Sequence, residues 1–367
     1  MLVLAIVFLA SLVVQLVFIG LLVWGITRKN NPTVTDDKPA VTVLVCAHDE
    51  EENLRKLVPR LLDQEYPHME VIVVDDRSND GTYDYIRELS QTDKRLKVVR
   101  VEHLPDHVNA KKYAITLGIK AAANEWILFT DADCMPQSSG WIAAMSGYMD
   151  KDAQFVLGFS PYEKQRGLLN LFIRFETLFT AIQYIGFANL GMPYMGVGRN
   201  LAYRKSWFLA NKGFGTLLHV TGGDDDLYVN RHATRSTVRV CVGEKSLVFS
   251  KPKQSLAAFF AQKKRHLFAG KRYRLKHKVV LTLFMGSYGI SWLSGLWLLG
   301  TGSEGLYAAA LLVVRSISLA LLVHRASVRF NISFAPYAVL ILDILFVFYY
   351  LTTAPLALFS KQVKWTK

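Results

Sequence analysis

Acidic side chains gather at three places in the chain, and their spacing suits metal binding and proton transfer. The clusters are the pair Asp75-Asp76, the spaced pair Asp131 and Asp133, and the triplet Asp224-Asp225-Asp226. Carboxylate oxygens are the ligands that Mg²⁺ and Mn²⁺ prefer. Clustered like charges also raise the proton affinity of a carboxylate, which helps a general base. Carboxylates that hold a phosphorylated ligand need a divalent cation between the like charges, so the residue types predict such a cation.

The segments before these carboxylates predict an α/β fold. Short runs rich in β-branched residues predict strands at 41–47, 71–76, 97–102 and 126–133. Helices are expected between them at 51–64, 82–90 and 109–123. A βαβ series gives a mostly parallel, Rossmann-like sheet with right-handed crossovers, and ligands bind beyond the carboxyl ends of its strands. The first two acidic clusters stand at those ends, as does the polar run His48-Asp49-Glu50.

Two common nucleotide-binding motifs are absent from the sequence. No GxGxxG follows the first predicted strand and no GxxxxGK[ST] occurs, which disfavours a dinucleotide site and a P-loop. The cysteines Cys46, Cys134 and Cys241 show no metal-binding spacing, which predicts free thiols in a reducing compartment.

The composition separates into apolar and charged regions. The chain has 367 residues, 51% of them hydrophobic, and a formal net charge of +13. Residues 1–26 and 279–359 are nearly free of charge, whereas the charges concentrate between 27 and 278. This pattern excludes a disordered, a collagen-like or a simple secreted chain, and predicts a soluble domain of about 250 residues held between membrane segments.

Four apolar stretches are long enough to span a bilayer. They are residues 1–26, 279–300, 305–323 and 335–359. Arg28 and Lys29 place the domain after the first stretch in the cytoplasm, by the positive-inside rule. Four spans would leave the lysines of residues 361–367 outside, against that rule, so one stretch could be re-entrant.

Charges also occur inside the apolar stretches. Arg315 and Asp343 are such residues, and intramembrane charges are costly, so they either serve a function or pair with each other. The run 167–191 predicts a helix that lies at the membrane surface or packs in a core. Residues 255–278 join an apolar start to a basic end and predict an interfacial segment. The expected organisation is therefore a first span (1–26), a soluble domain (27–254), an interfacial segment (255–278) and a C-terminal membrane region (279–367).

Four motifs occur in an order that resembles the GT-A glycosyltransferases. They are VTVLVCAHDEEENL (41–54), VIVVDDRSNDGT (71–82), WILFTDADCMP (126–136) with its DxD, and TGGDDDLYVNR (221–231). A fifth run, QKKRH (262–266), resembles the QxxRW motif of membrane-bound synthases. Together they resemble glycosyltransferase family 2, in its membrane-bound branch related to polysaccharide synthases, over about residues 40–270.

The resemblance implies a donor-binding role for several residues. Asp131 is expected near ribose and metal, and Asp133 as a ligand of Mg²⁺ or Mn²⁺. One of Asp75 and Asp76 is expected to bind the nucleotide base while the other caps a turn. Lys111, with Lys112 as runner-up, is expected to reach the phosphate or donor sugar, although either could be a solvated helix lysine.

Other positions depart from the family pattern or leave alternatives open. The remaining donor-side candidates are Ala47, His48, which stands where an aromatic often does, Glu50, Gln262 and Arg265. Arg199, Asn200 and His266, which replaces the usual Trp, are acceptor-side candidates, and the first two could equally form a structural turn. Alignment on Leu227 assigns the catalytic base to Asp224, with Asp225 as an extra carboxylate and Gly223 where an acid is usual.

The resemblance implies an inverting hexosyltransferase that uses a nucleotide-sugar donor, commonly a UDP-sugar. The expected acceptor is a lipid-linked or polysaccharide glycan at the cytoplasmic face of the membrane, the plasma or inner membrane in a bacterium. Single transfer is preferred to chain polymerisation, because His266 replaces the Trp of processive synthases. Membrane lipids are expected partners, and nucleic acid is not. A catalytically inactive GT-A scaffold and a transporter are the rival hypotheses.

Overall fold

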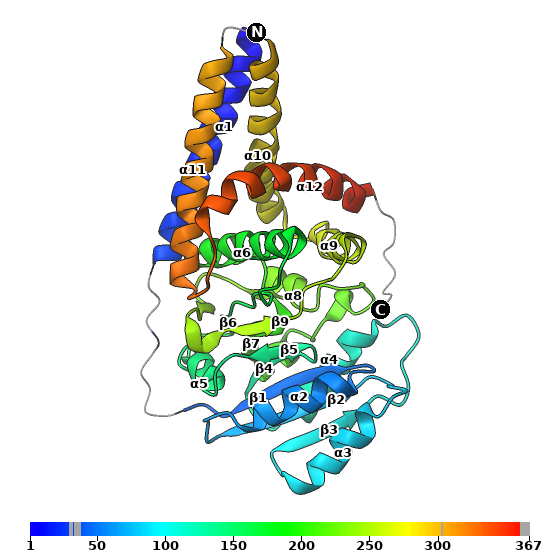
Figure 1. The fold of residues 1–367 in the computed structure, drawn as a ribbon. Helices are drawn as coiled ribbons and strands as arrows, with labels where there is room; N and C mark the ends of the chain where they lie inside the picture. The colour runs from blue at the N-terminus through cyan, green and yellow to red at the C-terminus, as the bar shows by residue number, and fades with distance from the viewer. Residues whose placement is uncertain (29–31, 33–37, 302–303, 360–367) are drawn as a thin grey trace. The chain divides into compact units, whose positions relative to one another are not determined.

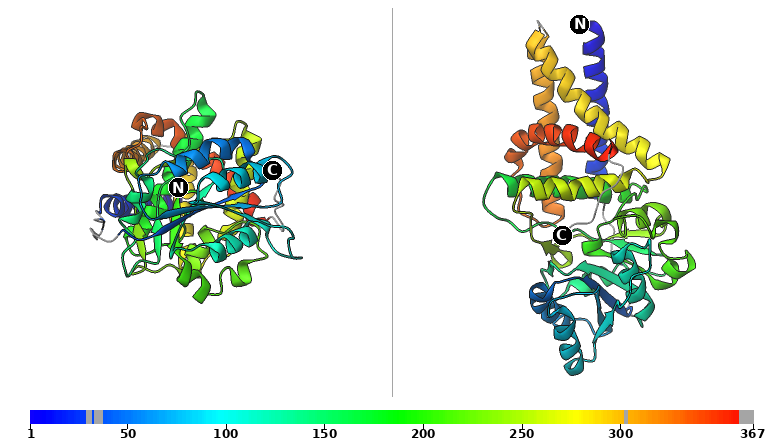
Figure 2. Two further views of the ribbon diagram at one scale, coloured as in Figure 1. Left: turned by 90° about the horizontal axis from the view of Figure 1, so that it is seen from below. Right: turned by 90° about the vertical axis from the view of Figure 1, so that its right-hand side faces the viewer.

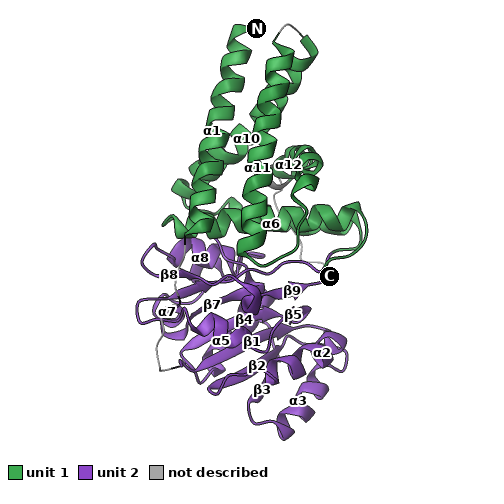
Figure 3. Cartoon of the chain, turned by 60° about the vertical axis from the view of Figure 1, so that its left-hand side comes forward, with its two compact units in different colours: residues 1–29, 164–192, 253–363 green, residues 30–163, 193–252, 364–367 purple. Residues whose placement is uncertain are grey.

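The structure is a computed structural model that describes residues 1–28, 32, 38–301 and 304–359. Lys29 and residues 361–367, which entered the topology prediction, lie outside the described residues. The chain forms two compact units (Figure 3). Unit 1 comprises 1–29, 164–192 and 253–363, and unit 2 comprises 30–163, 193–252 and 364–367.

Unit 2 is an α/β domain with nine strands among its described residues. The strands are β1 (Val41–Ala47), β2 (Met69–Asp75), β3 (Leu96–Arg100), β4 (Trp126–Asp131), β5 (Cys134–Pro136), β6 (Phe155–Leu157), β7 (Leu201–Arg204), β8 (Val238–Val240) and β9 (Val248–Ser250). The helices are α2 (Glu51–Leu62), α3 (Thr82–Thr92), α4 (Ala110–Ala121), α5 (Trp141–Ser146), α7 (Lys205–Ala210) and α8 (Asp226–His232), with 3₁₀ turns η1 (Gly198–Asn200), η2 (Gly215–Leu217) and η3 (Glu244–Ser246).

Seven of these strands form one mixed sheet in the order β3-β2-β1-β4-β7-β6-β8. Strands β1 to β4 are parallel neighbours in the order 3-2-1-4, whereas β7 is antiparallel to both β4 and β6. Strands β5 and β9 pair separately. The predicted mostly parallel α/β fold is confirmed, with its strands and helices displaced by only a few residues from the expected ranges.

Strands β2 and β3 add to one side of β1 and β4 adds to the other, and this reversal of strand order puts helices on both faces of the sheet (Figure 2). The face that bears Val43 and Val45 packs against α2, α3 and α5 in the main core. The opposite face bears Leu44 and packs against α4, where a Cβ on Gly118 would lie 2.4 Å from Leu44 Cδ1. Glycine is therefore needed at position 118 for α4 to approach the sheet this closely.

Unit 1 consists of helices. They are α1 (Leu2–Thr27), α6 (Leu168–Asn189), α9 (Leu256–Gly270), α10 (Leu275–Thr301), α11 (Gly305–Arg329) and α12 (Val339–Phe359), with the turn η4 (Pro336–Ala338) before α12. Four stretches are long and apolar enough to cross a membrane: α1, α10, α11 and Pro336–Leu356. Yet only α1, α10 and α11 run side by side, whereas α12 lies across them next to α6 and α9 (Figures 1 and 2).

Helix α6 belongs to unit 1 although its sequence lies within the range predicted for the soluble domain (27–254). The physical reason is a close backbone contact with α1, because a Cβ on Gly25 would lie 2.5 Å from the carbonyl oxygen of Gly186. Most of the α6 side chains are buried, and α6 also contacts α11 and α12. Of the two predictions for this run, the structure favours a packed helix.

The two charges within the apolar stretches pair with each other. Arg315 on α11 and Asp343 on α12 are both fully buried and form an ion pair. Asp343 also accepts hydrogen bonds from Ser316, at 2.8 Å, and from the hydroxyl of Tyr288 on α10. The pair thereby ties α12 to two helices of the bundle.

Candidate active site

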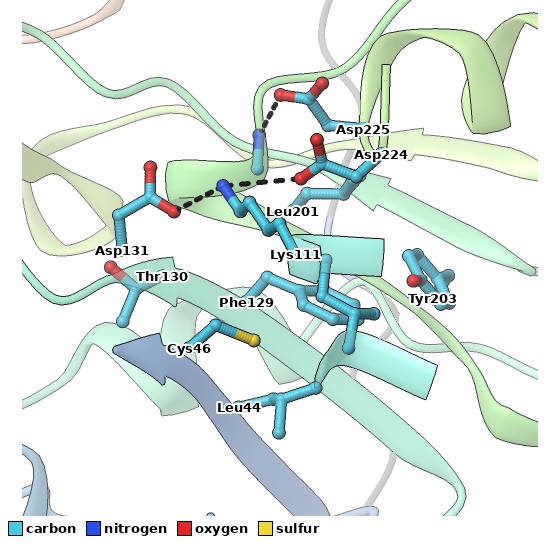
Figure 4. Close-up of a pocket in the computed structure, with 12 residues that line it drawn as sticks. Leu44, Cys46, Lys111, Phe129, Thr130, Asp131, Leu201, Tyr203, Asp224 and Asp225 are labelled. Carbon is cyan, nitrogen blue, oxygen red and sulfur yellow. Dashed lines mark hydrogen bonds and ion pairs between the residues drawn. The ribbon is translucent and has the colours of Figure 1, made fainter. Parts of the chain in front are cut away.

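The reversal of strand order places a crevice at the carboxyl ends of β1 and β4. Cys46 on β1 lies opposite Asp131 on β4 in the register of the sheet. The crevice between strands that lead to opposite faces is the usual ligand site of such folds. A pocket opens there, and its lining is contributed by β1, α4, β4, η1, β7 and the turn before α8 (Figure 4).

Lys111 lies at the centre of this pocket, on the first turn of α4. Its Nζ lies 3.0 Å from Asp131 Oδ1 and 3.3 Å from Asp224 Oδ2 (Figure 4). Burial alone would lower the pKa of Lys111, but the charges of Asp131, Asp224 and Asp225 raise it well above its usual value. Lys111 is therefore a permanent cation between the DxD motif and the acidic motif.

Asp224 and Asp225 both line the pocket but differ in their contacts. Asp225 is the N-cap of α8, and its two oxygens accept hydrogen bonds from the backbone N–H groups of Asp226 and Gly198, both at 2.7 Å. Asp224 precedes the helix, and its Oδ1 has no hydrogen-bond partner among the described residues. Asp224 thus has an oxygen that can accept a proton, whereas both oxygens of Asp225 already accept hydrogen bonds from the backbone.

Neither aspartate lies within a helix, because α8 begins at Asp226 and Asp225 is its N-cap. Burial and then the neighbouring charge of Asp224 raise the pKa of Asp225 to about 6. Asp225 therefore binds a proton more readily than an isolated aspartate does.

The DxD motif fits a divalent cation. Ligand atoms of Asp131, Asp133 and Cys134 all lie within 4.8 Å of one another. Burial raises the pKa of the Cys134 thiol well above its usual value, so the thiol stays neutral and is a poor ligand for a hard cation. The two carboxylates supply the oxygen ligands that Mg²⁺ and Mn²⁺ prefer.

Arg199 and Asn200, predicted together, have different surroundings. Arg199 stacks on Tyr162, with 4.6 Å from its guanidinium carbon to the ring centre, and its Nη1 is buried with no hydrogen-bond partner among the described residues. Burial alone would lower the pKa of Arg199, but Tyr162, Cys134 and Asp131 raise it. Asn200 is fully buried, where it accepts from Trp141 Nε1 and donates to the carbonyls of Phe159 and Ser246, which favours its structural alternative.

The first two strands end in a connected polar cluster. Ala47 O accepts from Asp76 N at 2.8 Å, and His48 Nδ1 donates to Asp76 O at 2.6 Å. Asp75 is fully buried, and its Oδ2 has no hydrogen-bond partner within the described chain, with Arg100 Nε 3.6 Å away. Asp76 instead pairs with Arg77, at 2.9 Å.

Glu50 takes part in the local turn, because its N–H donates to Thr82 Oγ1 at 2.9 Å and its carboxylate accepts from Asn53. Gln262, Arg265 and His266 lie on α9 of unit 1. Their donor and acceptor roles stay predictions.

Some residues of the site were not predicted from the sequence. Cys46 and Tyr203 line the pocket without having been singled out as site residues, whereas Lys112, the predicted runner-up to Lys111, is fully buried. The alternation along β1 could have found Cys46, because residues 44 and 46 lie on one face of the strand. No pattern in the sequence indicates which groups Lys112 contacts.

Comparisons with known proteins agree with this geometry. Residues 42–208 match the family model described as Glycosyl transferase family 2. An uncharacterized glycosyltransferase of Haemophilus influenzae is 28% identical over 114 residues, which are 31% of this chain and 34% of the relative. The probable glycosyltransferase YdaM of Bacillus subtilis is 32% identical over 144 residues, 38% of this chain and 34% of the relative. The matches thus span about a third of the length of these curated relatives.

Among solved structures, the mannosyltransferase PcManGT of Pyrobaculum calidifontis, in complex with GDP-Man and Mn²⁺, has a TM-score of 0.65 at 20% identity. The alignment covers 98% of this chain and 99% of that one, and it shows a shared fold. Residues 42–208 are therefore similar to glycosyltransferase family 2, and they lie in a domain of the GT-A fold.

Proposed function

We propose that the protein is an inverting glycosyltransferase that moves a sugar from a nucleotide-sugar donor to an acceptor hydroxyl. The observation that carries the proposal is the position of Lys111, whose Nζ lies within 3.3 Å of both Asp131 of the DxD motif and Asp224 of the acidic motif. The groups expected to hold the donor and to activate the acceptor thereby line one pocket.

Asp131 and Asp133 are the residues that would hold Mg²⁺ or Mn²⁺. A bound divalent cation neutralises the charge that develops on the leaving diphosphate. Lys111 and Arg199 add permanent positive charge beside these carboxylates, which also favours an anionic ligand. The mannosyltransferase of similar fold binds GDP-Man with Mn²⁺, which supports a donor site of this kind.

Asp224 is proposed as the general base that takes the proton of the acceptor hydroxyl. Inversion requires a single in-line displacement and therefore one carboxylate base, with no nucleophilic carboxylate. Asp224 Oδ1 has no partner among the described residues, so it can accept this proton. Asp225 positions the base, because its bond to Gly198 N joins the turn before α8 to η1.

Asp75 is proposed to recognise the base of the nucleotide. Its Oδ2 is buried without a hydrogen-bond partner among the described residues, and such an oxygen suits an N–H donor. Uracil and guanine both offer a ring N–H, and a UDP-sugar is the donor that the sequence motifs favour. Asp75 also caps the turn, because its Oδ1 accepts from Ser78 N at 3.3 Å, whereas Asp76 pairs with Arg77.

We further propose that α1, α10 and α11 cross the membrane and that α12 lies at its cytoplasmic boundary. The support is the crosswise position of α12 in unit 1 (Figures 1 and 2). Basic residues mark the same end of the three bundle helices, with Arg28 after α1, Lys276 at the start of α10 and Arg329 at the end of α11. Positive charge at that end favours the cytoplasmic side.

The proposed acceptor is a lipid-linked or polysaccharide glycan at that face, and single transfer is preferred to polymerisation. The test is to incubate purified protein with a panel of UDP- and GDP-sugars, Mn²⁺ and membrane lipid extract. Release of the nucleoside diphosphate with one donor, dependent on the extract, is the expected result. No release with any donor and extract would contradict the proposal and favour an inactive GT-A scaffold.

A further inference from the structure

Lys112 is a fully buried lysine one residue after Lys111. A buried ammonium is costly unless its donors are satisfied. Lys112 Nζ donates to three backbone carbonyls, Leu217 O at 2.9 Å, Val220 O at 2.8 Å and Gly222 O at 2.6 Å. An ammonium has three N–H donors, so these three carbonyls match its full donor capacity.

The three carbonyls come from the loop that leads into the acidic motif. Gly222 and Gly223, with φ of 70° and 76°, immediately precede Asp224. A Cβ at Gly223 would also lie 2.4 Å from Leu227 Cδ1, so this turn depends on glycine. Glycine loses more conformational entropy on folding than other residues do. A loop with two glycines in the left-handed region is therefore ordered mainly by contacts with other segments.

The start of α4 supplies that anchor at more than one point. Asn109 caps α4 by accepting from Lys112 N at 3.2 Å, and Asn109 N donates to Leu218 O at 2.9 Å. The ring of Phe214 lies 5.8 Å from Lys112 Nζ and adds a cation–π contact. One helix turn thus holds the loop through Lys112 while Lys111 contacts the carboxylate of Asp224 that follows the loop.

We propose that Lys112 is a positioning residue that fixes the loop 217–223 so that Asp224 lies beside Lys111. The ammonium of Lys112 is satisfied by carbonyls, so it does not serve as a second donor-phosphate ligand. A displacement of a catalytic group by about 1 Å can lower a rate by about 10²-fold. This inference rests on the proposed glycosyltransferase function, but its structural part can be tested without turnover.

The experiment compares Lys112→Met with Lys120→Met, a matched change at an exposed lysine on the same helix. Hydrogen–deuterium exchange of full-length protein is measured over residues 215–226 and over the rest of unit 2. We expect faster exchange confined to 215–226 in Lys112→Met and no change in Lys120→Met. Unchanged exchange of the loop would overturn the proposal, and so would a uniform increase across unit 2, because that is general destabilisation.

The second experiment measures steady-state kinetics with the donor that the wild-type protein turns over. We expect Lys112→Met to lower kcat by at least about 10-fold, while the donor KM and the Kd for the matching nucleoside diphosphate stay within about 2-fold. Loss of nucleotide binding in parallel with kcat would overturn a role in positioning the base. If wild-type protein turns over no donor, the proposed function fails while the exchange experiment still decides the structural claim.

Lys112→Met leaves three carbonyls without their donor, a loss that can prevent folding, so Lys112→Arg is the second variant. It keeps the positive charge, but a planar guanidinium cannot direct three donors at carbonyls that converge on one atom. We expect a folded protein with faster loop exchange and reduced kcat. Wild-type exchange and wild-type kcat in Lys112→Arg would overturn the proposal.

Discussion

Lys111 Nζ lies 3.3 Å from Oδ2 of Asp224, which leaves the other oxygen of that carboxylate without a hydrogen-bond partner among the described residues. Asp225, one residue on, uses both of its oxygens to hold backbone N–H groups. Two adjacent aspartates of the same motif therefore offer different chemistry. The contrast leads to a prediction that separates them.

Asp224→Asn should lower kcat by at least about 10², because general-base catalysis contributes about 10²–10⁴-fold and an amide cannot accept the proton. Nucleoside diphosphate binding should stay near normal, since the change is nearly isosteric. Asp225→Asn should affect kcat much less but lower thermal stability, because an amide cannot replace both accepted hydrogen bonds. Steady-state kinetics and thermal unfolding of the two variants measure this difference. The reverse order of kcat effects would assign the base to Asp225.

The pH dependence of kcat should show an acid limb near pH 6. Burial and the charge of Asp224 raise the pKa of Asp225 to about 6, so below this pH Asp225 is protonated and holds the backbone N–H groups of Gly198 and Asp226 less well, which loosens the turn that carries the base. Activity is therefore expected to rise as pH increases through 6. Asp225→Asn removes the group that titrates near pH 6, so this limb should be absent from the variant. A limb near pH 6 that persists in Asp225→Asn would show that another group produces it.

Metal dependence provides a third prediction. Asp133→Ala should abolish turnover and weaken the binding of Mn²⁺ in the presence of UDP or GDP, because one of two carboxylate ligands is lost. Isothermal titration of Mn²⁺ measures the affinity directly, apart from activity. Glu65→Ala, a change at another acidic residue of unit 2, is the control and should bind Mn²⁺ as the wild type does. Full wild-type activity in excess chelator would refute this role of the DxD motif.

The buried ion pair in unit 1 leads to a prediction about stability. Arg315→Met and Asp343→Asn should each destabilise the protein strongly, since removing one partner of a buried pair typically costs about 3–5 kcal/mol. The double variant Arg315→Met, Asp343→Leu leaves no unpaired charge and should recover part of the loss. Thermal unfolding in detergent ranks the variants by their stability. A double variant less stable than both single variants would show that the charges do more than pair.

The position of α12 leads to a prediction about topology. A green fluorescent protein fused after residue 367 should fluoresce, and alkaline phosphatase at the same place should be inactive, because both report the cytoplasm. Insertion of the same reporters after Glu304, between α10 and α11, should give the opposite pattern. Active phosphatase at the C-terminal fusion would show that α12 crosses the membrane.

Much of the fold could be predicted from the sequence because its signals are local. The runs at 41–47 and 126–133 become β1 and β4, and the acidic residues at their ends follow from strand direction. Asp131 and Asp224 could be singled out by residue type and order. Their meeting at Lys111 could not be derived from spacing, because it depends on three separate segments.

Features that rest on long-range contacts were beyond sequence reasoning. Lys112 bonds carbonyls 105 to 110 residues away, and any residue type can provide a carbonyl. The crosswise position of α12 could not be predicted from the sequence either, because its segment is as long and as apolar as a helix that spans a membrane. The charge of Asp343 in an apolar stretch indicated either a functional residue or an ion pair with Arg315, and the sequence could not decide between these two roles.

The ion pair also has a consequence for how the protein is made. Arg315 leaves the ribosome 28 residues before Asp343. At roughly 5–20 residues per second, this helix waits a second or more for its counter-ion to be synthesised. Until then, Gln15 and Tyr288, both translated earlier, are the polar groups at hand for the guanidinium. A nascent chain that ends before residue 343 therefore carries the guanidinium of Arg315 without its carboxylate partner, which is costly in a helix that crosses the membrane as proposed for α11.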